Sequence, residues 1–98
     1  MARFDVFRTI DGNYVIDYQA DLLDYLKTRL VIPLLPPELE PKISERLNPA
    51  FIIDNKRYVL YPQFTASVSA RELTDFVISL ADHHFTIVDA FDMLTSGY

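Results

Sequence analysis

The two histidines of the sequence, His83 and His84, are the first candidates for metal binding or acid–base catalysis. Adjacent residues on a helix point about 100° apart, so this pair cannot easily bind one metal ion. Asp82 and Asp89 could add carboxylate ligands, but their spacing matches no zinc-binding pattern. We therefore interpret both imidazoles as surface groups on the first turn of a helix, and we predict no metal site.

A cluster of aspartates, Asp17, Asp21 and Asp24, has the composition of an acid–base pair or a Mg²⁺ site. Phosphoryl chemistry would also need a glycine-rich phosphate loop and a lysine, and the whole sequence holds only two glycines. Aspartate is in addition a common residue of turns and helix caps. We interpret the cluster as part of a loop.

The remaining residues indicate no reaction class. The sequence has no cysteine, which excludes disulfides, thiolate metal sites and cysteine nucleophiles. It also has no Gly-x-Ser-x-Gly elbow and no Ser–His–Asp context. We predict no catalytic residue and no cofactor, and we favour a protein that acts by binding.

The charge of the sequence is unevenly distributed. There are 14 acidic and 9 basic residues, which gives a net charge of −5, and residues 72–98 contain no Lys or Arg at all. Because nucleic-acid binding depends mainly on Lys and Arg that neutralise phosphates, we expect no direct binding of DNA or RNA. The acidic end is typical of a surface that binds a basic partner, or of one kept acidic for solubility.

The length of 98 residues is that of one domain, so we expect residues 1–98 to form a single domain. No apolar run approaches the roughly 20 residues of a membrane span. The first residues do not resemble a signal peptide. We expect a cytoplasmic protein with no membrane segment.

Residues 3–62 have the pattern of short strands. Apolar and polar residues alternate at 3–7 and 14–19, and Asp11-Gly12 between them favours a hairpin turn. Residues 50–53 and 57–61 form a second expected hairpin, around residues 54–56. The pattern predicts a small barrel-like antiparallel sheet.

Residues 30–35 are apolar at every position, which is typical of a strand covered on both faces. Pro33 lies within this run and has no N–H to donate to a neighbouring strand. We therefore expect Pro33 at a sheet edge, a bulge or a strand end.

The C-terminal residues change to a helical period. Apolar residues repeat on one stripe at Ile87, Ala90, Phe91 and Leu94, the pattern of a helix packed on a sheet. Asp82 is the expected N-cap. Gly97 suits the position after the helix, where a left-handed conformation ends it.

Phe85, Val88 and Met93 are apolar residues of the same helix that lie off this stripe. Either the sheet wraps further around the helix, or a partner covers these residues. We favour a partner or a dimer contact over chance exposure.

Residues 69–80 have two interpretations. Ser69 and Glu72 form a capping-box pattern, and the apolar residues that follow have helical spacing. Val68 and Ala70 could equally continue the sheet.

The strings with the most specific pattern are Asp-Tyr-Gln-Ala-Asp-Leu-Leu-Asp at residues 17–24 and Arg-Leu-Val-Ile-Pro-Leu at 29–34. Together they resemble the CcdB family of bacterial toxins, which carries Asp-x-Gln-Ser-Asp-aliphatic-aliphatic-Asp and then Arg-x-Val-Ile-Pro-Leu. Arg-Leu-Asn-Pro at 46–49, Ala-Ser-Val at 66–68 and the glycine near the C-terminus also match. The family's extended stretch conflicts with a helix at 69–80, and there we follow the family.

The resemblance implies an SH3-like β-barrel followed by a C-terminal α-helix, in a mainly β protein that forms a homodimer. It implies the toxin of a toxin–antitoxin pair, with a role in plasmid maintenance, directed at the A subunit of DNA gyrase. Such toxins trap gyrase on cleaved DNA without catalysing a reaction. A CcdA-like antitoxin wraps the toxin, and the two together repress their shared operon.

The resemblance also implies which residues contact gyrase. The aliphatic pair of the family falls on Leu22 and Leu23, and its gyrase-contacting helix end falls on Asp92, Thr95, Ser96, Gly97 and Tyr98. The best-known family terminus is Phe-Trp-Gly-Ile, and residues 95–98 are Thr-Ser-Gly-Tyr here. The indole anchor is therefore absent, and Tyr98 could supply an aromatic ring one residue later.

Two alternatives belong to other classes of function. An endoribonuclease toxin of the MazF/Kid kind would need arginines and a base gathered in a groove for RNA. Arg29, Arg57 and Arg71 are few and scattered in the sequence, which argues against it. The second alternative is a protein-interaction barrel with no toxicity.

Overall fold

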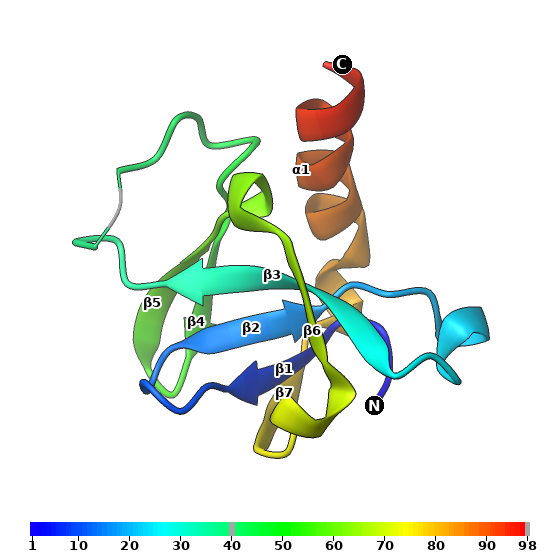
Figure 1. Ribbon diagram of the computed structural model, residues 1–98. Helices are drawn as coiled ribbons and strands as arrows, with labels where there is room; N and C mark the ends of the chain where they lie inside the picture. Colours follow the sequence, from blue (N-terminus) through cyan, green and yellow to red (C-terminus); the bar gives the residue numbers. More distant parts are fainter. Residues whose placement is uncertain (40, 98) are drawn as a thin grey trace.

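The structure, a computed structural model, describes residues 1–39 and 41–97. Within these residues an antiparallel sheet curls into a half-barrel, and one α-helix follows it at the C-terminus (Figure 1). The predicted mainly β fold with a C-terminal helix is confirmed. No helix among the described residues is long and apolar enough to span a bilayer.

The described strands make one sheet in the order β4-β5-β3-β2-β1-β7, and β6 pairs with the first half of β3. The strands are β1 (Asp5–Arg8), β2 (Tyr14–Asp17), β3 (Thr28–Leu35), β4 (Ala50–Ile53), β5 (Lys56–Leu60), β6 (Ala66–Ser69) and β7 (Phe76–Ser79). The helix α1 spans His84–Ser96, and short 3₁₀ turns are η1 (Asp21–Leu23), η2 (Pro62–Phe64), η3 (Ala70–Glu72) and η4 (Ala81–His83).

Both predicted hairpins are confirmed, and local turn chemistry explains them. β1 pairs with β2 around a turn in which Gly12 has a φ of 87°. β4 pairs with β5 around Asp54 and Asn55, whose φ angles are 52° and 63°. Two successive left-handed residues match the twist of the flanking strands, and Asn and Asp tolerate this conformation better than other side chains.

The expectation for Pro33 was wrong about its place, because it lies inside β3 and opposite Val15 of β2. On the other side of β3, pairing with β6 ends at Val31 and pairing with β5 begins at Leu34. The Pro33 carbonyl points to that side, since it accepts a hydrogen bond from the Tyr61 N–H at 3.0 Å. The proline nitrogen faces the same gap between partner strands, so no ladder hydrogen bond is lost.

β3 is covered on both faces, as its apolar run predicts. Ile32 and Leu34 face the main core, which also includes Ile87 of α1. Val31 faces a smaller cluster on the opposite side of the sheet, with Leu73 from the segment between η3 and β7.

Residues 69–80 combine both interpretations. The capping box is present, since the Ser69 Oγ accepts from the Arg71 N–H and the Glu72 carboxylate accepts from the Ser69 N–H. It supports only the 3₁₀ turn η3, so the alternative of a longer helix, which was not the one followed, is excluded. The extended interpretation is confirmed for Val68, which lies in β6, but not for Ala70, which begins η3. After η3 the chain is again extended: β7 pairs with β1, and the Phe76 ring lies edge-on to Phe7 at 6.0 Å.

The C-terminal helix is confirmed, but Asp82 is not its N-cap. The turn η4 precedes α1, and His83 occupies the cap position without a capping side-chain hydrogen bond. Gly97 ends the helix as predicted, with a φ of 77° and an N–H that donates to the Met93 carbonyl at 3.1 Å.

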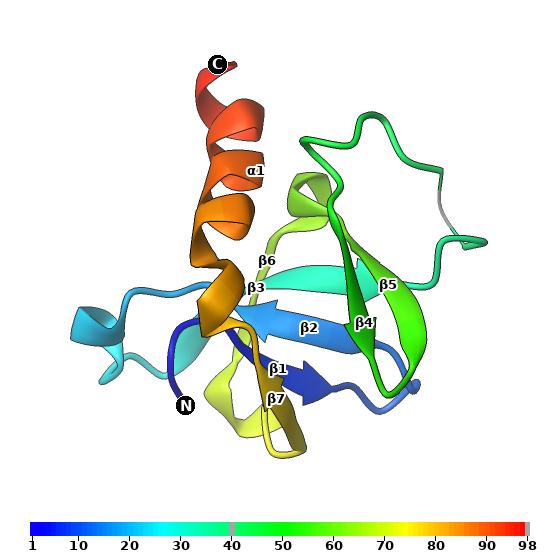
Figure 2. The same cartoon turned by 180° about the vertical axis from the view of Figure 1, so that it is seen from behind.

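The predicted apolar stripe of α1 is only partly covered. Ile87 and Ala90 are fully buried and Phe91 packs against the core, but Leu94 is 43% exposed. The reason is geometric, because the last turns of α1 extend beyond the sheet in both views (Figures 1 and 2).

Two of the three residues off the stripe are covered by the fold itself. Val88 packs against the core, and Met93 lies half-buried beside Ser44. Phe85 is 80% exposed and remains available to a partner.

Candidate functional site

The aspartate cluster is divided between a buried ion pair and a surface loop. Asp17 and Arg29 are 0% and 1% exposed, and the shortest contact between their side chains is 2.6 Å, from Arg29 Nη2 to Asp17 Oδ2. Asp21 instead accepts a hydrogen bond from the Arg3 N–H through its Oδ1 at 2.8 Å. The loop interpretation is confirmed for Asp21 and Asp24, which lie at η1, but it was wrong for Asp17, which ends β2 and has a structural role.

Gln19 connects this ion pair to the loop that follows β2. Its backbone N–H donates to Asp17 Oδ1 at 3.2 Å. Its side-chain Oε1 accepts from the Leu30 N–H at 3.1 Å, and its Nε2 donates to the Leu23 carbonyl at 2.8 Å. The Asp-x-Gln and Arg strings of the sequence thus form one buried network.

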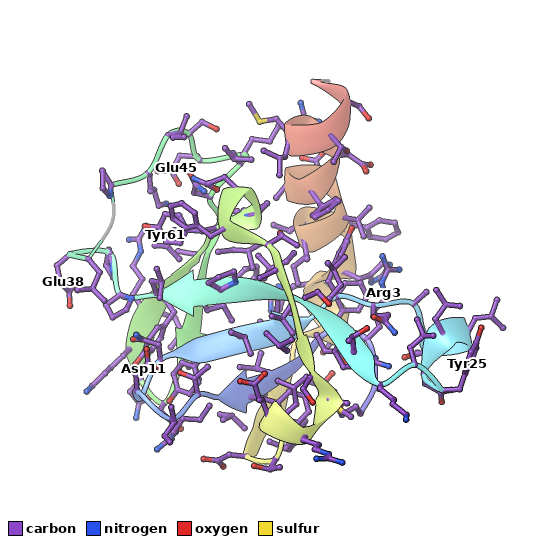
Figure 3. All side chains as sticks on the ribbon, viewed as in Figure 1. Arg3, Asp11, Tyr25, Glu38, Glu45 and Tyr61 are labelled. Carbon is purple, nitrogen blue, oxygen red and sulfur yellow. The ribbon has the colours of Figure 1, made fainter. Side chains whose placement is uncertain are left out.

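Residues 20–26, which we name the apolar loop, expose large side chains around η1. Leu22 and Tyr25 are 86% and 75% exposed, and Leu23 and Leu26 are about half as exposed, at 39% and 40%. Figure 3 shows Tyr25 at the outer end of this loop, away from the sheet. Sequence reasoning named Leu22 and Leu23 but missed Tyr25 and Leu26, although four apolar residues in five between β2 and β3 were a usable indication.

The helix end predicted to contact gyrase is exposed as far as the structure describes it. Asp92, Thr95, Ser96 and Gly97 all lie at the surface, and the last turn carries no basic residue. Tyr98 lies outside the described residues. The left-handed backbone conformation of Gly97 ends α1 and sets the direction of the chain after it.

Aromatic stacking joins the base of the apolar loop to α1. Arg3 lies over the rings of Phe4 and Tyr18, at 4.8 Å and 4.7 Å from their centroids, and its Nε donates to the Tyr18 carbonyl. The Tyr18 ring stacks on Phe91 of α1 at 4.7 Å. Figure 3 shows Arg3 between the helix and the loop.

The two predicted contact regions nevertheless do not meet on one chain. Figures 1 and 2 place η1 beside the sheet, at about the level of β2, and the end of α1 well beyond the sheet. A target that touches both must therefore span the face of α1 between them, or meet them on two copies of the chain.

Burial of Tyr18 has a consequence at alkaline pH. Burial raises the pKa of Tyr18 above the ordinary tyrosine value of 10.0, the charge of Arg3 opposes this rise, and that of Asp92 adds to it. A phenol with a higher pKa when folded stabilises the fold fully below about pH 10, and this contribution is lost as the pH rises above that value.

We therefore expect the Tyr18→Phe variant to lose less stability than the unmodified protein between about pH 8 and pH 11. Urea unfolding at each pH measures this difference. Tyr14, whose pKa is also raised by burial, remains in both proteins and accounts for a shared part of the loss. Identical pH profiles would contradict a buried Tyr18 hydroxyl.

The histidines are placed in aromatic surroundings. The Nδ1 of His84 lies 2.9 Å from the Ala81 carbonyl oxygen, and the His83 ring meets the edge of Phe51 at 5.3 Å. Among residues 1–39 and 41–97, no group of three or more His, Asp or Glu side chains is arranged to hold a metal ion.

These features define the class of protein: a small half-barrel with a C-terminal helix, which carries an exposed apolar loop on a buried polar network. The chain belongs to the CcdB family, since the family model described as CcdB protein matches residues 3–97. Membership implies the toxin of a toxin–antitoxin system. A comparison with curated proteins found no match.

Proposed function

We propose that this toxin binds the A subunit of DNA gyrase and traps the enzyme without catalysing a reaction itself. The observation that carries the proposal is the exposure of Leu22 and Leu23. The resemblance to the family implies that its gyrase-contacting aliphatic pair falls on these two residues. Two exposed leucines fixed on a short turn are costly in water and favourable in an interface, at about 1.5–3 kcal/mol for each fully buried side chain.

The acidic C-terminal part supports a basic target. Residues 72–98 carry five acidic residues and no Lys or Arg, and in the folded chain Asp89 is paired with Arg46 at 2.9 Å while Asp92 carries no such ion pair among the described residues. Such a surface is attracted to the basic groove of a DNA-handling enzyme and does not compete for its DNA. In this proposal Asp92, Thr95, Ser96, Gly97 and Tyr98 supply the second contact region.

The proposal includes partners of the toxin besides gyrase. The toxin acts as a homodimer in the cytoplasm, so that two apolar loops and two helix ends face the paired A subunits. Exposed Phe85 and Leu94 on α1 give the dimer or the antitoxin apolar surface to cover. A CcdA-like antitoxin neutralises the toxin, and the complex represses the operon.

We expect the double variant Leu22→Ser/Leu23→Ser to bind the gyrase A subunit at least about 100-fold more weakly, which equals about 2.7 kcal/mol. Both side chains lie at the surface, so its free energy of unfolding should change by no more than about 0.5 kcal/mol per site. Isothermal titration with purified A subunit measures the affinity, and a supercoiling assay measures inhibition.

Ile52→Ser is the matched control, because Ile52 is 65% exposed on β4 and lies outside the proposed surface. It should bind and inhibit like the unmodified toxin. Equal binding by the double variant and the control would contradict the assignment of the apolar loop.

The endoribonuclease alternative predicts a different outcome, namely cleavage of cellular RNA on induction while gyrase remains active. Of the arginines considered for it, Arg29 is 1% exposed and paired with Asp17, which removes it from any surface groove. This burial favours the gyrase proposal.

A further inference from the structure

We propose that Gln19 is a positioning residue, which holds the apolar loop in the conformation that meets the target. The inference rests on the proposed function, because the target in question is the gyrase A subunit. Gln19 itself is 9% exposed and presents no surface for a partner. It acts through the Leu23 carbonyl, to which its Nε2 donates at 2.8 Å.

The apolar loop has little else to fix it. η1 is three residues long and buries none of its side chains. Its own backbone hydrogen bonds are single-turn contacts, from the Leu23 N–H to the Ala20 carbonyl, from the Asp24 N–H to the Asp21 carbonyl and from the Leu26 N–H to the Leu23 carbonyl. Because 3₁₀ turns of this length have poor hydrogen-bond geometry, the loop depends on contacts to the sheet for its rigidity.

Among the described residues, two side-chain hydrogen bonds join the loop to the rest of the fold, one at each side of η1. The Arg3 N–H donates to Asp21 Oδ1, but this contact is at the surface. The Gln19 carboxamide joins the loop to β3, since its Oε1 accepts from the Leu30 N–H while its Nε2 reaches Leu23. A buried carboxamide whose oxygen and nitrogen are both hydrogen-bonded is held in one rotamer. The Leu23 carbonyl that it binds is held in place with it.

The backbone of Gln19 is fixed in turn by the ion pair. Its N–H donates to Asp17 Oδ1, and Asp17 is held by Arg29 through contacts of 2.6 Å and 3.1 Å to Oδ2. The buried charges therefore act on the surface through one intermediate side chain. The network begins in β3, passes through the end of β2 and ends at the carbonyl of Leu23.

Rigidity matters for binding because a mobile loop must be ordered when the target binds. If the binding conformation is populated one tenth of the time, the apparent Kd rises about tenfold even though no contact residue has changed. Loss of the Gln19 side chain should thus weaken binding while Leu22 and Leu23 remain in place.

The test compares the full-length toxin with its Gln19→Met variant, which has a side chain of similar length and no hydrogen-bonding amide. We expect NMR order parameters of the amides of residues 21–24 to fall from the value of a rigid backbone, about 0.85, toward that of a flexible one, below about 0.6. We expect the Kd for the purified gyrase A subunit to rise about tenfold.

Tyr14→Phe is the control. It removes the hydrogen bond from the Tyr14 hydroxyl to Asp54 at the other end of β2, with almost no change of shape. It should leave both the order parameters of residues 21–24 and the Kd unchanged.

Unchanged order parameters in Gln19→Met, or a mobile loop with an unchanged Kd, would overturn the inference. If Gln19→Met does not fold, the unmodified toxin still decides. In the unmodified toxin, residues 21–24 should be as rigid as β2, and the Gln19 side-chain amide protons should exchange slowly with water. A mobile loop would overturn the inference. Failure of the unmodified toxin to bind gyrase would instead reject the proposed function and leave the loop measurement valid.

Discussion

We expect the Arg29→Met variant to lose about 3–5 kcal/mol of its free energy of unfolding. The substitution leaves the carboxylate of Asp17, which is 0% exposed, without its counter-charge in the interior of the sheet. The cost of an unpaired buried charge exceeds the net value of the pair that it replaces. Urea or guanidinium unfolding followed by circular dichroism measures the loss.

Two further variants separate this cause from a loss of packing. Asp17→Leu/Arg29→Met removes both charges, and it should recover most of the lost stability because no unpaired ion remains. Asp24→Asn changes a surface aspartate of the same string and should alter the free energy of unfolding by no more than about 0.5 kcal/mol. A loss below about 1 kcal/mol in Arg29→Met would show that the pair is not buried as described.

The second large effect is expected at the end of α1. Gly97→Val should weaken binding to the gyrase A subunit at least about 30-fold, the 2 kcal/mol of an interface hot spot, and abolish toxicity. Gly97 has a φ of 77°, and a Cβ built at this position meets nothing within 4 Å. Space around the side chain therefore does not exclude valine at position 97. The positive φ does, because a β-branched residue rarely adopts it.

The expected change is local. A valine at position 97 shifts the backbone away from the left-handed conformation, so the hydrogen bond from residue 97 to the Met93 carbonyl is lost and the last turn moves. The core lies further back along α1, at Ile87 and Ala90, so folding and antitoxin binding should be largely unchanged.

Gly97→Asn is the control for conformation, because asparagine tolerates a positive φ. It should retain more gyrase affinity and toxicity than Gly97→Val. Full toxicity of Gly97→Val, with α1 and the antitoxin complex intact, would show that the target surface lies elsewhere.

Local chemistry explains which parts of the fold could be predicted from sequence. The turns at Asp11-Gly12 and Asp54-Asn55 and the end of α1 at Gly97 depend on residues that tolerate a positive φ. Such information lies within a few neighbouring residues. The point at which the helical turn begun at Ser69 ends could not be predicted in this way. It depends on β7, which pairs with β1 some seventy positions earlier in the chain.

The candidate site shows the same division. The resemblance indicated Leu22 and Leu23, and both are exposed in the structure. The pairing of Asp17 with Arg29 crosses from β2 to β3, so the sequence alone left Asp17 among the loop aspartates. Asp82 was expected to cap α1, but the turn η4 includes Asp82, so the cap falls one residue later, at His83.

Titration of the purified toxin into purified gyrase A subunit, beside a supercoiling assay of the whole enzyme, tests the proposed function most directly. We predict saturable binding, loss of supercoiling and accumulation of cleaved DNA, all reduced together in Leu22→Ser/Leu23→Ser and in Gly97→Val. Normal supercoiling and no binding by correctly folded toxin would contradict the proposal.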